Sequence, residues 1–400
     1  MTDSLLTAEY RYLPIQKVLY GAGMVKQLSQ EVERTGAKSV ALICSNSLFD
    51  SLYVKNIKEI LGGKLVAVLS GTRQHTLSES VFEIASKIKD KNVDLLISLG
   101  GGTVIDTTKA ISLILAESLT GKEELSRYSV KFEYGKEVEI PAIKNAVLPH
   151  VAIPTTLSAA EFSNIIGITD EKKKVKELYI DDKLTPITVI LDPEYSVQTP
   201  SWLWLASGIR ALDHAIETIY SKGKQLIPTT LALEAIKILA ENLPKCKENP
   251  DDLYPRLLCQ QAAWMSFFGV TNVMMGLSHG IGHQIGAHGN VAHGITSCIM
   301  LPHVMRHCLS ETISEQAMIA KAMGASAFGK DEEELATQAS YLVEELVNRL
   351  DLPTKLSEVN VLKEQFKDIA ADAMADLVVA SSPKAVHNEQ ELIELLELAW

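Results

Sequence analysis

The histidines in the second half of the chain are the residues whose types and spacing point most clearly to chemistry. Six of the ten histidines lie between His279 and His307. His279 and His283 are four residues apart, so a helix places both on one face. Imidazole is the commonest metal ligand and carries protons near neutral pH. With His214 and His293 on neighbouring predicted elements, the cluster predicts a divalent metal site or an acid–base site.

A purely structural role is the alternative for these histidines, because buried imidazoles also satisfy backbone groups. The small residues around the histidines favour a functional site over a structural role, since glycines allow helices or a substrate to approach closely. Glycines recur throughout this segment, at Gly276, Gly280, Gly282, Gly286, Gly289 and Gly294.

Two polar turns predict a nucleotide site. Gly100-Gly101-Gly102 follows a predicted strand and opens a predicted helix, whose free N–H groups suit a pyrophosphate. The usual GxGxxG fingerprint is absent. The second turn, Pro154 to Ser158, follows another strand. Asn46 comes just past a strand end, where a side chain that contacts the ribose would lie. Such turns line the ligand crevice at the carboxyl ends of the strands in an open α/β sheet.

The elements that must position these residues fall into two halves. Apolar runs in the first half predict strands at 39–44, 65–69, 94–99, 147–153 and 188–191, separated by amphipathic stretches at 24–34 and 78–89. This alternation predicts a parallel sheet with helices on both faces. Almost no strand-like run follows Asp192-Pro193. We therefore predict an α/β dinucleotide-binding domain over residues 1–197 and an all-helical domain over residues 198–400.

The composition narrows the class of protein. The net charge is −12 and there is no large basic cluster, which argues against nucleic-acid binding. Residues 1–13 show no apolar leader, and no uncharged apolar run reaches the length of a membrane span. The five cysteines are odd in number and lack CxxC spacing, so we expect free thiols and a cytoplasmic enzyme.

Taken together, these segments resemble the iron-containing (group III) alcohol dehydrogenases over nearly the whole chain. The resemblance rests on residues 100–106, Pro154-Thr155-Thr156 with Glu161, residues 208–217, and residues 279–306. It implies a dehydroquinate synthase-like architecture with the active site between the domains. It also implies hydride transfer between NAD or NADP and a small alcohol, aldehyde or ketone, and a homodimer. The turn over residues 154–161 is more similar to that of the maleylacetate reductase branch.

The resemblance also implies roles for individual residues. The glycines of the first turn hold the pyrophosphate, and Lys176 stands close to the nicotinamide. The metal-dependent members bind their ion with one Asp and three His, and the three His positions match His214, His279 and His293. His283 is a nearby catalytic or substrate-side residue. The cofactor contacts implied in this way are Asn46, Gly100, Gly101, Gly102, Thr103, Asp106, Thr155, Thr156, Ser158 and Lys176.

One departure from the family pattern decides the chemistry we expect. The position of the Asp ligand is Arg210. Asp213 is adjacent to His214, so it is turned about 100° away from that histidine on the helix. A guanidinium stays charged and repels a cation, since even unit charges 4 Å apart cost roughly 4 kcal/mol at an effective dielectric of 20. Our hypothesis is that Arg210 takes over part of the task of an iron or zinc ion, or pairs with a substrate carboxylate. His279 or His283 then passes the proton to the alkoxide.

Two other functions remain open from the sequence. A dehydroquinate synthase-like lyase would use NAD within its cycle, but it needs a phosphate-binding set of Lys and Arg that we do not find. A nucleotide-binding protein with a degenerate site is supported only by the missing Asp ligand. The choice between NAD and NADP depends on Asn46, because a neutral side chain there does not repel a 2′-phosphate.

Overall fold

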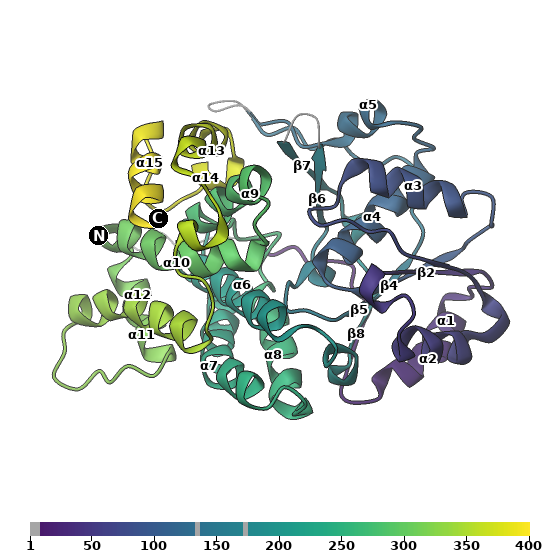
Figure 1. Cartoon of the computed structure of the whole chain (residues 1–400), viewed down its shortest axis with the longest axis horizontal. Helices are drawn as coiled ribbons and strands as arrows, with labels where there is room; N and C mark the ends of the chain where they lie inside the picture. Colours follow the sequence, from purple (N-terminus) through teal and green to yellow (C-terminus); the bar gives the residue numbers. More distant parts are fainter. Residues whose placement is uncertain (1–8, 133–136, 171–174) are drawn as a thin grey trace.

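The structure, a computed structural model, describes residues 9–132, 137–170 and 175–400. The chain forms two parts, a sheet with its covering helices and a helical part that carries the C-terminus (Figure 1). The first eight residues, on which part of the expectation about a leader rests, lie outside the described residues.

A six-stranded parallel sheet forms the centre of the first part. The strand order is β1-β8-β5-β4-β2-β3, and every neighbouring pair is parallel. All five predicted strands are present, and β1 is an addition at one edge. The strands are β1 (Lys17–Tyr20), β2 (Val40–Cys44), β3 (Leu65–Leu69), β4 (Leu95–Gly100), β5 (His150–Pro154) and β8 (Thr188–Leu191).

Helices cover both faces of the sheet, as predicted. Helices α1 (Leu28–Thr35) and α2 (Leu52–Leu61) pack with one set of alternate strand residues, including Leu42 and Ile97. Helices α3 (Ser78–Ile88) and α4 (Gly102–Ala116) pack with the other set, including Ile43 and Leu96. Strands β2 and β4 are buried along their whole length because both faces are covered. The short helix α5 (Lys122–Leu125) follows α4.

A two-stranded antiparallel hairpin, β6 (Ile165–Asp170) and β7 (Val175–Ile180), stands apart from the main sheet. The sequence analysis did not predict it. Strand β7 contacts helix α9 (Leu277–Gly289) of the helical part, so this hairpin brings Lys176 to the boundary between the two parts.

The second part is helical throughout its described length, as predicted. Helix α9 continues through Gly289, so the glycines at 286 and 289 lie within it. Asn290, the next residue, takes up a left-handed conformation, with φ 52°. The helices are α6 (Ser201–Tyr220), α7 (Leu226–Glu248), α8 (Leu253–Ser266), α9 (Leu277–Gly289), α10 (His293–Cys308), α11 (Ile313–Ala322), α12 (Glu332–Arg349), α13 (Phe366–Met374), α14 (Leu377–Ala380) and α15 (Glu389–Leu398).

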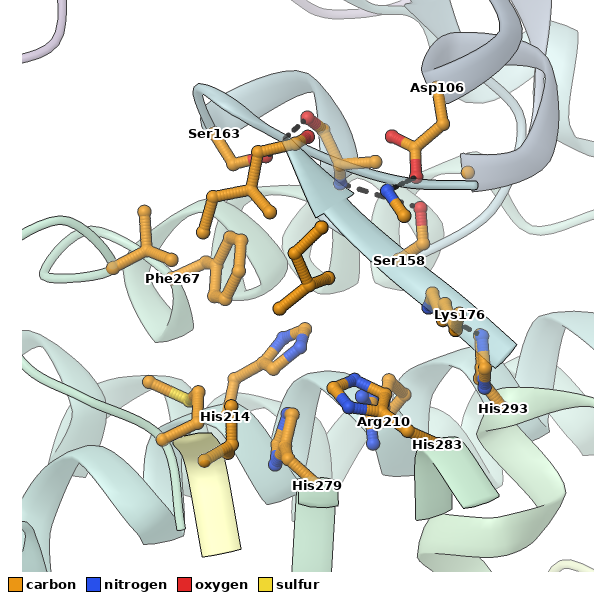
Figure 2. A pocket seen from close by; sticks show the side chains of 18 of the residues that line it. Asp106, Ser158, Ser163, Lys176, Arg210, His214, Phe267, His279, His283 and His293 are labelled. Atoms are coloured by element: carbon orange, nitrogen blue, oxygen red, sulfur yellow. Dashed lines mark hydrogen bonds between the residues drawn. The ribbon is translucent and has the colours of Figure 1, made fainter. Parts of the chain in front are cut away.

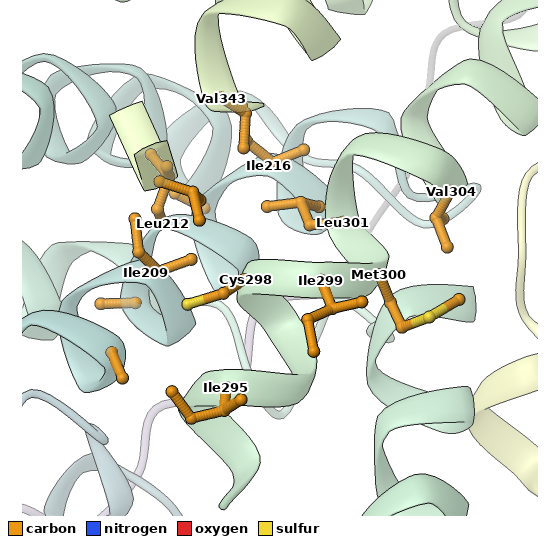
Figure 3. Close-up of a cluster of buried hydrophobic side chains, with 14 of the residues drawn as sticks. Ile209, Leu212, Ile216, Ile295, Cys298, Ile299, Met300, Leu301, Val304 and Val343 are labelled. Carbon is orange, nitrogen blue, oxygen red and sulfur yellow. The ribbon is translucent and has the colours of Figure 1, made fainter. Parts of the chain in front are cut away.

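Helix α6 is the central element of the helical part. Every residue from Trp204 to Tyr220 is buried, and the helix packs against α7, α8 and α10. Figure 3 shows its apolar residues, among them Ile209, Leu212 and Ile216, in one cluster with residues of α10. Helix α6 also buries four charged or titratable residues, Arg210, Asp213, His214 and Glu217, which belong to the candidate site described below. Among the described residues, no helix is both long and apolar enough to cross a membrane.

Candidate active site between the two parts

Two adjoining cavities lie where the glycine turn meets the helical part. We call them the cofactor groove, of about 450 Å³, and the substrate cavity, of about 240 Å³. The second volume lies below the roughly 300–1,000 Å³ usual for ligand pockets, so it suits a small molecule. The two cavities share a wall made of His75, Gly102, Thr103, Ser158, Arg210 and His293.

The cofactor groove depends on the close approach of the two predicted turns. A Cβ on Gly101 would lie 3.0 Å from Cγ2 of Thr156, and one on Gly102 would lie 2.9 Å from Oγ of Ser158. Helix α4 begins at Gly102, so its free N–H groups open onto the groove. The predicted residues that line this groove are Gly101, Gly102, Thr103, Thr155, Thr156 and Ser158. Gly100 ends β4 with φ 157°, and a Cβ there would meet Val104.

Four predicted cofactor residues lie outside the lining of this groove: Gly100, Asn46, Asp106 and Lys176. The Oδ1 atom of Asn46 accepts a hydrogen bond from the backbone N–H of Gly71 at 2.7 Å. Asp106 and Lys176 instead line the substrate cavity. The lining of the groove includes Ser45, Ser47 and Leu48, which flank Asn46, and Thr72 and Gln74, which follow its partner Gly71.

Three helices bring the predicted histidines together in the substrate cavity (Figure 2). His214 comes from α6, His279 and His283 from α9, and His293 from the first position of α10. The ring centroids of His214 and His279 are 4.8 Å apart, and those of His283 and His293 are 6.0 Å apart. Three of their nitrogens are buried without a hydrogen-bond partner: His214 Nδ1, His279 Nε2 and His293 Nδ1.

Two carboxylates hold His279. Its Nδ1 lies 2.6 Å from Oε2 of Glu217 and 3.5 Å from Oδ1 of Asp213. Burial and Arg210 oppose a charge on the ring, yet Asp213 and Glu217 together raise the pKa of His279 above its usual value. The Nδ1–H therefore donates to Glu217, and Nε2 remains for a ligand.

Arg210 is buried beside the histidines. Its Nη1 donates to Oγ of Ser297 at 3.0 Å and lies 3.6 Å from Oδ2 of Asp213. Gly282 leaves room for the guanidinium, because a Cβ there would lie 3.8 Å from Nη1. Burial lowers the pKa of Arg210, and Asp213 and Glu217 act in the opposite direction. A guanidinium keeps its charge under these conditions, so the position of the family's Asp ligand carries a positive charge.

Lys176 adds a second positive charge to the same cavity. Its Nζ lies 3.0 Å from Nε2 of His293, an atom that accepts the hydrogen bond when the ring is neutral. Burial lowers the pKa of Lys176 to about 8, and Arg210 also lowers it, while Asp106 raises it. Burial and Lys176 hold the pKa of His293 well below its usual range. This pair is therefore an ammonium that donates to a neutral imidazole.

The donor set does not fit the one-Asp, three-His metal centre of the metal-dependent relatives. The Asp position is a buried guanidinium, and Nε2 of His293 is engaged by an ammonium. A divalent ion among His214, His279 and His293 would face both cations without a carboxylate ligand at that position. We therefore derive no catalytic step through a metal.

A different group, Asp213, Glu217 and His279, offers potential ligand atoms within 4.8 Å of one another. Three of its four carboxylate oxygens already have hydrogen-bond partners, and only Oδ1 of Asp213 has none. Glu217 accepts from the backbone N–H groups of Gly276 and Ser278 and from His279. Asp213 accepts from the hydroxyls of Ser278 and Ser297 through Oδ2. The group is better explained as a clamp that caps the start of α9 and orients His279.

Sequence reasoning missed several residues of this site. Asp213 was interpreted as turned away, but it lies against both Arg210 and His279. Glu217 follows His214 by three residues on one helix face, which is the signal that could have identified it. His75 gave no signal, because a loop far away in the sequence brings it edge-on to His293, with ring centroids 5.2 Å apart.

Comparison with known proteins agrees with this arrangement. A glycine turn at the carboxyl edge of a parallel sheet, next to a small histidine-lined cavity, suits a dinucleotide-dependent oxidoreductase. Two family models match the chain: iron-containing alcohol dehydrogenase over residues 15–193, and the C-terminal part of the Fe-containing alcohol dehydrogenase family over residues 204–400. The chain belongs to the iron-containing alcohol dehydrogenase family.

Several curated relatives are similar over nearly the whole chain. NAD-dependent methanol dehydrogenase of Bacillus methanolicus is 31% identical, with 97% of this chain and 99% of the relative covered. Lactaldehyde reductase of Escherichia coli K12 is 29% identical, with 95% and 97% covered. Maleylacetate reductase 2 of Cupriavidus pinatubonensis is 28% identical, with 81% and 80% covered. These identities do not separate the maleylacetate reductase branch from the others.

Solved structures share the fold. A 1,3-propanediol oxidoreductase superposes with a TM-score of 0.90 at 24% identity, covering 98% of this chain and all of the other. Maleylacetate reductase from Agrobacterium tumefaciens gives a TM-score of 0.79 at 22% identity, covering 99% of each chain.

The predicted class of function is confirmed. The chain is an NAD(P)-dependent oxidoreductase that interconverts a small alcohol and a carbonyl compound, in a family that uses a divalent metal. The lyase and the degenerate binding protein are not favoured, because the relatives are dehydrogenases and reductases.

Proposed function

We propose that this enzyme transfers hydride to a small carbonyl compound without a metal, with Arg210 supplying the positive charge at the reacting oxygen. The observation that supports this most directly is the position of Arg210 in the wall shared by the two cavities. A nicotinamide ring in the groove reaches the substrate at this wall. A fixed guanidinium there stabilises the developing alkoxide.

His279 is our proposed proton donor. The hydride goes from the reduced nicotinamide to the carbonyl carbon, and the carbonyl oxygen takes the proton from Nε2 of His279. Glu217 and Asp213 favour the protonated ring, whereas burial and Lys176 lower the pKa of His283 to about 4, even though Asp376 accepts from its Nδ1. His283 is therefore neutral near pH 7, so we assign it to substrate positioning.

We also propose that the enzyme accepts NADPH in addition to NADH. The described residues that line the cofactor groove include no carboxylate, so none of them repels the 2′-phosphate of a bound NADPH. The domain boundary that we propose, near residue 197, lies in the segment between the end of β8 and the start of α6.

The setting we propose is a homodimer in the cytoplasm. All five cysteines are buried and free, which suits a reducing compartment. The homodimer is a family-level expectation, and light scattering after size-exclusion chromatography tests it.

The deciding experiment combines turnover with metal analysis. Protein purified without chelator is tested for oxidation of NADH and NADPH with a panel of small aldehydes and ketones, before and after treatment with a chelator. We expect substoichiometric iron and zinc and unchanged turnover after chelation. Stoichiometric metal together with chelator-sensitive activity would contradict the metal-free mechanism.

A second arm tests the proton donor. His279→Asn should lower kcat by about 100-fold or more, the usual range for loss of a general acid. His283→Asn should affect KM more than kcat. Equal losses of kcat in the two variants would overturn the assignment.

A further inference from the structure

Lys176 carries a positive charge but takes no part in the proposed hydride transfer. We propose that the substrate carries an anionic group in addition to its carbonyl, and that Lys176 binds this group. This inference rests on the proposed function and narrows its substrate class to small carbonyl compounds with a carboxylate, sulfonate or phosphonate.

The charge of Lys176 lacks a close partner. Within the described part of the chain, no carboxylate oxygen lies within 4.0 Å of its Nζ, and its one hydrogen bond is to His293. Asp376 acts from further away and is occupied by His283, Gln284 and the backbone N–H of Val378. Asp106 also acts from a distance, and its Oδ2 accepts from the backbone N–H of Gly167. Two of the three ammonium donors of Lys176 are therefore available to a ligand.

The fold holds this side chain in place. The stem of Lys176 crosses Gly167 of the paired strand β6, where a Cβ would lie only 2.0 Å from Cε. No residue except glycine fits under this stem without displacing it. The ammonium is thereby directed into the substrate cavity, next to His293, as Figure 2 shows.

The position of Lys176 distinguishes it from Arg210. Arg210 lines both the cofactor groove and the substrate cavity, whereas Lys176 lines the substrate cavity and not the groove. A pyrophosphate in the groove therefore does not account for its charge. A ligand with its carbonyl at the shared wall and its anion at Lys176 satisfies both cations.

The rest of the cavity fits the carbon chain of such a ligand. Phe267, Val270, Met274 and Met275 line it with apolar surface, and its volume is about 240 Å³. Two buried cations without an anion between them repel each other. A bound carboxylate, sulfonate or phosphonate replaces that repulsion with charge-assisted hydrogen bonds.

The test compares aldehydes in pairs. Aldehydes with a terminal carboxylate, sulfonate or phosphonate are each matched with an uncharged aldehyde of equal chain length, and kcat/KM is measured with saturating coenzyme. We expect at least one charged aldehyde to exceed its uncharged match by about 10- to 100-fold, the value of one charge-assisted hydrogen bond. The three arms distinguish which anion the site takes.

Two substitutions test whether the preference for charged aldehydes depends on Lys176. Lys176→Gln should reduce the charged-to-uncharged ratio by about tenfold or more. Lys131→Gln is the matched control, since Lys131 lines the neighbouring cavity and its Nζ donates to Ser126 and Ser129. It should keep the wild-type ratio.

Calorimetry covers the case in which Lys176→Gln does not fold. Wild-type enzyme loaded with coenzyme should bind the unreactive alkyl carboxylate, sulfonate or phosphonate more tightly than the alcohol of equal length. Preference for the uncharged compounds in both turnover and binding would overturn the inference, as would an unchanged ratio in Lys176→Gln. Absence of turnover with every carbonyl would instead contradict the proposed function.

Discussion

At the scale of single residues, Arg210 is the feature that sets this enzyme apart from the metal-dependent pattern. It lies in the same cavity as His214, His279 and His293, each of which keeps one buried nitrogen without a hydrogen-bond partner. It is also paired with Asp213, whose Oδ2 lies 3.6 Å away. The chain thus has a carboxylate close to the position of the family's Asp ligand, but this carboxylate contacts His279 and Arg210. Positive charge in the cavity therefore comes from side chains.

Changing Arg210 to Asp should create a metal site. The substitution removes the cation and supplies the missing carboxylate next to His214, His279 and His293. We expect Arg210→Asp to bind close to one zinc or iron ion per chain, measured by elemental analysis after dialysis, with a thermal midpoint that rises on adding zinc. Arg210→Gln, which removes the charge without adding a ligand, is the control. Equal metal content in both variants would contradict the prediction.

Asp213 should be essential for stability. It is fully buried and lies within 4 Å of both Arg210 and His279. Burial would raise its pKa, yet charged His279 and Arg210 hold that pKa below its usual value. Asp213→Asn leaves Arg210 buried without its neighbouring carboxylate, so we expect a loss of about 3 kcal/mol in the free energy of unfolding, measured with urea. Glu344→Gln, in a partly exposed pair with Arg306, should cause no measurable loss.

At the scale of elements, the site depends on how closely helices α6, α9 and α10 approach one another. A Cβ on Gly294 would lie 2.5 Å from the carbonyl oxygen of Ala206 on α6. Gly280 near the start of α9 plays the same part against α14, because a Cβ there would lie 2.3 Å from Cγ2 of Val379. These contacts hold α10 against α6 and α9 against α14, and α10 and α9 are the helices that carry His293 and His279. The glycines around the histidines therefore serve helix packing, one of the two uses expected from the sequence.

Gly294→Ala should separate α10 from α6. The added methyl group meets backbone, which cannot move aside easily, so we expect a loss of about 1–3 kcal/mol in stability and a drop in kcat/KM of about tenfold or more. Thermal unfolding and steady-state kinetics measure the two effects. Gly63→Ala is the matched control, because no atom lies within 4 Å of a Cβ at that position. Wild-type kinetics in Gly294→Ala would refute this account of the packing.

At the scale of the whole molecule, the cofactor groove joins the two parts of the chain. Gly101 and Thr156 come from the sheet part, whereas Trp202, Ala292 and Gly294 come from the helical part. The substrate cavity has the same mixed origin, since β7 supplies Lys176 and the helices supply the histidines. A bound dinucleotide therefore contacts both parts at once.

Coenzyme binding should stabilise the folded chain. NADH at 100 times its dissociation constant should add about 2.7 kcal/mol, seen as a higher thermal midpoint. Gly101→Val should abolish this increase, because a Cβ there would already lie 3.0 Å from Thr156. Gly63→Ala again serves as control. A midpoint that rises equally in Gly101→Val would place the dinucleotide elsewhere.

Sequence alone determined the local features of this protein. The period of apolar residues identified the buried parallel strands and the helices, because covering both faces of a sheet requires continuous apolar runs. The glycine turn and the four histidines at 214, 279, 283 and 293 were identified because few residue types perform their chemistry. The charge of Arg210 was equally visible, since a guanidinium stays charged in any surroundings.

Only the tertiary structure decided what these residues contact. The direction of Asp213 could not be derived from its helical spacing, because the neighbouring helix α9 brings His279 to it. The β6–β7 hairpin, which carries Lys176 away from the cofactor groove and into the substrate cavity, was not predicted. Local periodicity fixes which face of an element is buried, whereas the partner across that face depends on packing between segments far apart in the sequence.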